Sequence, residues 1–95
     1  MPEGQENRHS ALELIEYPGR FPLKVFGGQS AQFEEIVLEL VKARSPQTEH
    51  FEVSRRVSKG GKYIALTVTF MVHSQKQLED IYQDLYECEH VVMSL

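Results

Sequence analysis

Two neighbouring glycines and two lysines carry the clearest hint of chemistry in this chain of 95 residues. Gly27 and Gly28 end a strand-like segment, and Ser30 stands where a helix is expected to begin. Glycines let a ligand approach the backbone, and the first turn of a helix offers N–H groups to a carboxylate or phosphate. The predicted site for a small anion comprises Gly27, Gly28, Gln29, Ser30, Lys59 and Lys62. The alternative is an ordinary strand-to-helix turn with solvated lysines.

Histidine, cysteine and carboxylate residues give no pattern typical of a catalytic or metal site. His50 and His73 are expected near each other beside Glu49, but zinc takes three or four ligands of this kind. Cys88 closes a predicted helix and is interpreted as a small apolar residue rather than a nucleophile. We therefore expect no enzymatic activity, no metal and no cofactor.

Composition and charge limit which binding partners and which cellular compartment we expect for this protein. The formal net charge is -4, so nucleic acid, which needs a basic footprint, is not an expected partner. One cysteine cannot form an internal disulfide, and no stretch approaches the roughly 18 apolar residues of a membrane span. The polar N-terminal segment lacks the apolar core of a signal peptide. We expect a cytoplasmic protein that does not bind membranes.

Four segments alternate between apolar and polar side chains, which predicts strands at 21–26, 51–58, 62–73 and 91–95. Arg55 interrupts the apolar face of the second strand, so we expect a bulge or a frayed edge there. In the last strand, Val91, Met93 and Leu95 are expected to face inward. That strand carries no charge, which leaves it open to pairing with another chain; the alternative is a short edge that the N-terminal segment covers.

Apolar residues at helical spacing predict two amphipathic helices, with stripes from Phe33 to Val41 and from Leu78 to Leu85. Ser30 is the expected N-cap of the first helix. Ser74 is the expected N-cap of the second, with Gln77 at the third helical position of a capping box.

The N-terminal residues are set apart from this pattern. Residues 1–17 are predicted to form a mobile segment, in which Ser10 and Glu13 match a capping box for a short helix that ends before Pro18. Residues 18–95 are predicted to form a single domain, as their number suggests.

The order β-α-β-β-α-β indicates a split βαβ arrangement. Right-handed crossovers then place both helices on one face of an antiparallel sheet with strand order 4-1-3-2, and they leave the other face open. Lys24 and Arg56 are expected on that open face. The candidate interface residues there are Phe26, Tyr63, Ala65, Thr67, Met71 and Val92. A merely solvated face is the alternative to a self-association or partner surface, and a homodimer is expected.

Several stretches resemble the YbeD-like family of small bacterial proteins. They are Leu14–Pro18, Phe21–Gly27, Ser58–Gly60, Tyr63 and Val91–Leu95. The resemblance implies an α+β, ferredoxin-like two-layer sandwich similar to the ACT regulatory domains, which bind amino acids or other small effectors. The family brings no established biochemical activity.

Two functional hypotheses follow. The first is a non-enzymatic regulatory module that senses a small anionic metabolite in an ACT-like manner. The second is an adaptor that docks onto a protein through its open sheet face or edge strand, without a ligand.

Overall fold

The computed structural model describes residues 15–95, and six elements follow one another in the predicted order. They are β1 (Gly19–Gly28), α2 (Phe33–Ala43), β2 (Glu52–Val57), β3 (Tyr63–Val72), α3 (Gln75–Glu87) and β4 (Val91–Ser94). Most of the short helix predicted to begin at Ser10 lies outside the described residues, and the described residues before Pro18, 15–17, are not helical.

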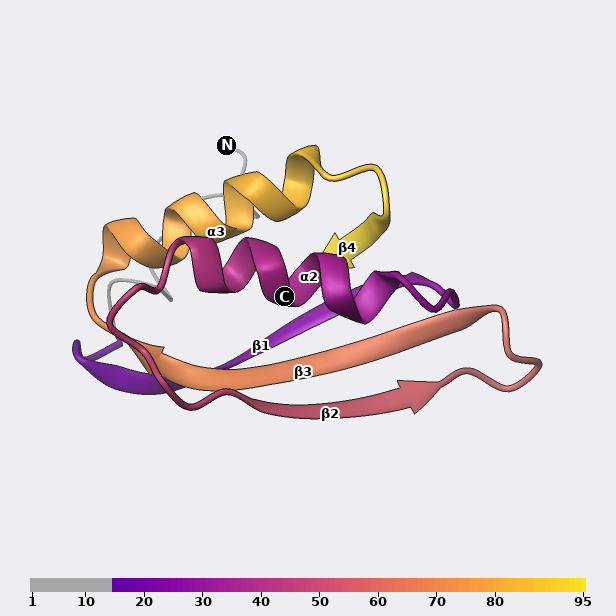
Figure 1. Cartoon of the computed structure of the whole chain (residues 1–95), viewed down its shortest axis with the longest axis horizontal. Helices are drawn as coiled ribbons and strands as arrows, with labels where there is room; N and C mark the ends of the chain where they lie inside the picture. The colour runs from indigo at the N-terminus through magenta and orange to yellow at the C-terminus, as the bar shows by residue number, and fades with distance from the viewer. Residues whose placement is uncertain (1–14) are drawn as a thin grey trace, which may run out of the picture.

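The four strands form one antiparallel sheet in the order β2-β3-β1-β4. This is the predicted order 4-1-3-2 read from the opposite edge. Both helices lie on the same side of the sheet, and no helix of residues 15–95 covers its other side, which we call the open side (Figure 1). A βαββαβ chain arranged in this way has a ferredoxin-like fold.

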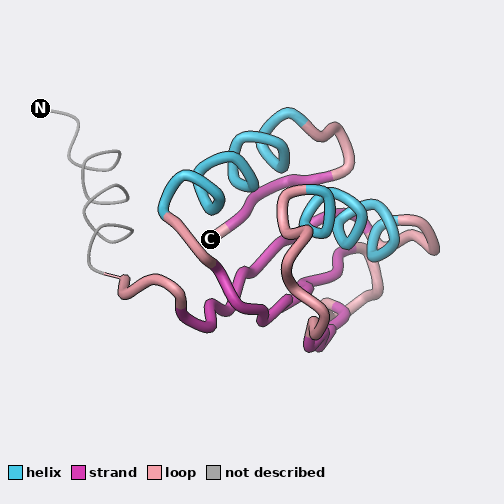
Figure 2. The backbone as a smooth tube through the Cα atoms, turned by 60° about the vertical axis from the view of Figure 1, so that its left-hand side comes forward, coloured by secondary structure: helices cyan, strands magenta, loops and turns pink. Residues whose placement is uncertain are grey.

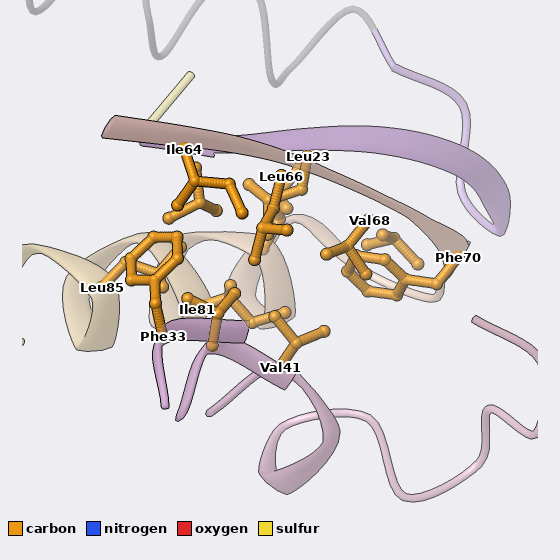
Figure 3. Packing of buried hydrophobic residues seen from close by; sticks show 13 residues of the cluster. Leu23, Phe33, Val41, Ile64, Leu66, Val68, Phe70, Ile81 and Leu85 are labelled. Atoms are coloured by element: carbon orange, nitrogen blue, oxygen red, sulfur yellow. The ribbon is translucent and has the colours of Figure 1, made fainter. Parts of the chain in front are cut away.

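The core lies between the helices and the sheet (Figure 3). Every second residue of β3, from Ile64 to Val72, is buried there, as the alternation of apolar side chains predicts. The other strands and the helices contribute Leu23, Val25, Phe33, Val37, Val41, Leu78, Ile81 and Leu85. Burial of this apolar surface, at about 25 cal/mol per Å², is the main favourable term in folding.

The two helices begin differently. α3 has the predicted capping box: the Ser74 hydroxyl accepts the Gln77 N–H at 3.1 Å, and Gln77 Oε1 accepts the His73 N–H at 2.7 Å. The prediction of Ser30 as N-cap of α2 was wrong. α2 begins at Phe33, and Ser30 contributes only its backbone carbonyl, which accepts the Phe33 N–H at 3.4 Å.

Arg55 does not interrupt β2, so the predicted bulge or frayed edge there was wrong. The β2–β3 ladder is regular from Glu52, opposite Thr69, to Val57, opposite Ile64. The Arg55 guanidinium reaches the first turn of α2, where Nε and one terminal nitrogen donate to the Glu34 carboxylate, each at 2.7 Å, so this charged side chain has a partner on the helix side of the sheet.

The inward orientation predicted for Met93 and Leu95 was also wrong. Met93 pairs with Phe26, and Leu95 exchanges backbone hydrogen bonds with Lys24, so both lie on the open side. The cause is a register shift between Phe26 and Gly27. An extra residue in β4 moves the following side chains to the other face, since strand side chains alternate with a period of two.

Candidate functional site

The predicted anion site is partly assembled. The Gln29 backbone N–H donates to the Lys62 carbonyl at 2.9 Å, so the turn after β1 lies against the β2–β3 hairpin. Lys59 and Lys62 are both exposed. The topology therefore brings the glycine turn and the lysine-bearing hairpin to one end of the sheet.

The surroundings of this turn fit an anion less well than the sequence indicates. Gly27 is buried, and a Cβ there would meet the Phe33 ring and the His90 carbonyl oxygen. The missing side chain thus makes room for a core aromatic ring, whereas the space beside Gly28 is open. Glu34 and Glu35 occupy the first turn of α2, where their charge opposes an incoming anion.

The open sheet face is organised in rows that cross the strands. One row runs from Arg56 through Ala65 and Phe26 to Met93. The next runs from Ser54 through Thr67 and Lys24 to Leu95. Of the predicted interface residues, Phe26, Ala65 and Thr67 are in these rows. Tyr63, Met71 and Val92 are exposed elsewhere, on β3 and β4.

A hollow of about 510 Å³ lies over these rows. We call it the basic hollow; its lining includes Lys24, Phe26, Ser54, Arg56, Ala65 and Thr67. Its location has a simple cause. β3 presents its small side chains, Ala65 and Thr67, between the longer side chains of β1 and β2, so the middle of the face is low and its flanks are high.

The cations of the basic hollow differ from the other three arginines of residues 15–95, which all form ion pairs. Arg20 pairs with Glu52 and Arg44 with Asp84, both at 2.7 Å, as Arg55 does with Glu34. Lys24 and Arg56 form no ion pair with any residue of the range 15–95.

Charge is also divided between the two layers. Apart from Glu52, the charged residues of the strands and the β2–β3 hairpin are all basic: Arg20, Lys24, Arg55, Arg56, Lys59 and Lys62. Acidic residues predominate on the helices: Glu34, Glu35, Glu39, Glu79, Asp80, Asp84 and Glu87. A negative net charge therefore hides a basic sheet face, which the overall composition does not reveal.

Within residues 15–95, the other candidate residues do not come together in a metal or catalytic site. In the described part of the chain, no group of three or more His, Cys, Asp and Glu is placed to hold a metal ion. Cys88 is half-buried and borders a second hollow of about 510 Å³ between the helices, which Asp84, Glu87 and Glu89 make acidic. No helix within residues 15–95 is long and apolar enough to cross a membrane.

The fold and this surface define a small ferredoxin-like domain with one open, basic sheet face. Residues 12–95 match the family described as Protein of unknown function (DUF493), and the chain belongs to that family. A UPF0250 protein of Neisseria gonorrhoeae is 42% identical over 91 residues, covering 96% of this chain and 97% of the relative. A UPF0250 protein of Nitrosomonas europaea is 38% identical over 82 residues, covering 86% and 94%.

A solved structure supports the fold. The solution structure of protein HP0495 from H. pylori is similar, with a TM-score of 0.70 and 21% sequence identity, covering 85% of each chain. At this identity the likeness extends to the fold alone.

Sequence reasoning placed Lys24 and Arg56 on the open face but did not combine them into a site, and it missed Ser54. The signal was present in the alternation, since these residues and Thr67 occupy the polar side of three strands. Combining them required the exact register, which decides that Ser54, Thr67 and Lys24 share one row.

Proposed function

We propose that the protein is a regulatory module without catalytic activity, which binds a small organic anion in the basic hollow of its open sheet face. The observation that carries the proposal is the pair of cations, Lys24 and Arg56, that flank a partly apolar floor without an ion-pair partner in the described region.

The lining defines the chemistry of the ligand. A guanidinium such as that of Arg56 binds a carboxylate or phosphate through two parallel hydrogen bonds, and the Lys24 ammonium adds a point charge. The Ser54 and Thr67 hydroxyls are further donors, while Phe26 offers an apolar surface. These groups favour a ligand in which a carboxylate or phosphate is attached to an aromatic or aliphatic group. The volume is within the roughly 300–1,000 Å³ of small-molecule sites.

This site differs in place from the one that the sequence predicts. Lys59 and Lys62 lie on the hairpin that follows β2 and do not line the basic hollow. We assign them a long-range part: their positive potential attracts an anion toward the sheet, an effect that salt screens.

The experiment compares two double variants that remove the same charge. Lys24→Ala with Arg56→Ala removes two positive charges from the basic hollow, and we call it the hollow variant. Lys59→Ala with Lys62→Ala removes two positive charges from the β2–β3 hairpin, and we call it the hairpin variant. Thermal unfolding is followed with citrate, benzoate and phenyl phosphate as probes. A bound probe adds RT ln(1 + [L]/Kd) to the stability of the folded state. We expect at least one probe to raise the melting temperature of the wild type and of the hairpin variant but not of the hollow variant.

Two results contradict the proposal. If none of the probes shifts the wild-type melting temperature, the hollow is not an anion site. If the hairpin variant loses the shift and the hollow variant keeps it, the site is the glycine turn with Lys59 and Lys62.

An adaptor function is the second candidate, and the exposed apolar side chains of Tyr63 and Met71 favour it. Apolar residues around a basic centre suit an acidic segment of another protein. A photo-crosslinking residue at Met71 should then give a specific adduct in cells, and the same residue at Lys42, on the helix layer, should not. Equal crosslinking at both positions contradicts the adaptor hypothesis.

A further inference from the structure

The two edges of the sheet differ in charge. The β2 edge carries Glu52, Arg55 and Arg56, and charged side chains are a common defence against pairing with another chain. The β4 edge, Val91–Ser94, carries no charged side chain. Among the described strands, β4 is hydrogen-bonded to β1 alone.

Apolar side chains gather at the β4 edge. Val92 is 70% exposed, Met93 49% and Leu95 54%. β4 runs beside α3 toward the C-terminus (Figure 2), and Tyr86 of α3 is 84% exposed. A hollow of about 270 Å³ lies between them, lined by Tyr82, Leu85, Tyr86 and the residues of β4. We call Tyr86, Val92, Met93 and Leu95 the β4 strip.

We propose that the β4 strip is an interface with a second copy of this chain, in which the two β4 strands pair antiparallel across a two-fold axis. The sheets then join into one, with both open faces on the same side. The proposal rests on the β4 edge and does not depend on the function of the basic hollow.

The absence of charged side chains from the β4 strip favours a second copy of this chain as its partner. A two-fold axis brings the same residues of each copy together, so a charged edge would meet its own sign. The β2 edge has that disadvantage, and the helix layer is predominantly acidic. The β4 strip is neutral, so two copies meet there without repulsion between charged side chains of the strip.

The exposed area sets an upper limit on the side-chain part of this interface. The four side chains of the strip, Tyr86 on the helix side and Met93 and Leu95 on the open side, expose on the order of 500 Å² per copy, which is about what the smallest specific interfaces bury on each partner. Backbone hydrogen bonds between the paired strands and entry of a partner side chain into the hollow beside Tyr82 would add to this area.

The test measures self-association by sedimentation equilibrium over a range of protein concentrations. The wild type is expected to change from an 11.0 kDa monomer to a dimer as concentration rises. Met93→Lys should raise the dimer dissociation constant at least about tenfold, because it places two like charges at the paired edges. Val57→Lys is the matched control: Val57 is an exposed apolar residue of the opposite edge, and its substitution should leave the dissociation constant unchanged.

Circular dichroism checks that each variant is folded. If Met93→Lys unfolds, Val92→Lys takes its place, because Val92 is the more exposed residue. A wild type that stays monomeric at every concentration overturns the proposal. So does a dimer that persists in the folded edge variant, or one that Val57→Lys disrupts as strongly.

Discussion

The two faces of β3 differ in what they contribute to the molecule. Toward the helices, the strand presents large side chains such as Leu66 and Phe70, which are fully buried. Toward the open side, its middle carries Ala65 and Thr67, which are small and only half-buried. The same ten residues thus supply packing on one side and a recessed surface on the other. We conclude that stability and recognition are separated by strand alternation, so substitutions on the two faces should have separable effects.

The largest expected effect is on the covered face. Leu66→Ala removes a fully buried side chain from the centre of the core and should lower the free energy of unfolding by about 2–5 kcal/mol. Thr67→Ala, one residue away on the open face, should change it by no more than about 0.5 kcal/mol. Urea unfolding of both variants measures the difference. Similar losses would mean that the open face is packed against something in solution.

Two neighbouring glycines at the end of β1 give a second test of the difference between packed and open positions. Gly27→Ala places a methyl group against the Phe33 ring and the His90 carbonyl, and the overpacking should cost about 1–3 kcal/mol. Gly28→Ala, which meets open space, should be close to neutral. Thermal unfolding compares the two variants. If Gly28→Ala is the more harmful, the assignment of Gly27 to core packing is wrong.

The Arg55–Glu34 pair links the β2 edge to the helix layer and has a smaller expected effect. The hydrogen bonds from Arg55 hold the pKa of the Glu34 carboxyl below its ordinary value. A depressed pKa stabilises the folded state at a pH above the unfolded pKa, and this contribution is lost as the pH falls through the folded value.

Because both side chains are partly exposed, the contribution should be at most about 1 kcal/mol. Glu34→Gln should therefore lower stability slightly at pH 7 and have less effect at a pH below the folded pKa of Glu34. Urea unfolding of wild type and variant over this pH range measures the change. A constant difference between the two proteins at all pH values would contradict the role of this ion pair.

For each cation of the basic hollow, the expected effect on stability is smaller than that of the Arg55–Glu34 pair. Lys24→Ala with Arg56→Ala should change the free energy of unfolding by no more than about 0.5 kcal/mol for each residue, since both side chains are exposed and make no ion pair with the described residues. The same variant is the one expected to lose anion binding. A clear loss of stability would show that these cations support the fold, and the two faces would then be less separate than proposed.

Much of this architecture could be predicted from the sequence. The alternation in β3 and the helical stripes around Val37 and Ile81 indicated which side of each element is buried. Their order in the chain indicated the strand order and the covered face, because right-handed crossovers leave few arrangements. The capping box of Ser74 and Gln77 could be predicted because it involves only neighbouring residues.

Other features depend on contacts between residues that are distant in the chain. Arg55 looked like a defect in β2 because its partner, Glu34, is on another element. Met93 and Leu95 were expected on the wrong side because the register shift opposite Phe26 and Gly27 depends on how β4 meets β1. The basic hollow needs three strands in exact register before Lys24, Thr67 and Ser54 form one row.

By itself, then, the sequence determined the elements, their order and the buried sides of β3 and the two helices, since hydrophobic periodicity is local and acts residue by residue along the chain. Only the tertiary structure decided which side chains meet across the sheet, since register and salt bridges depend on how separate elements pack. Most of the core could therefore be predicted from the sequence, whereas the basic hollow and the β4 strip required the tertiary structure.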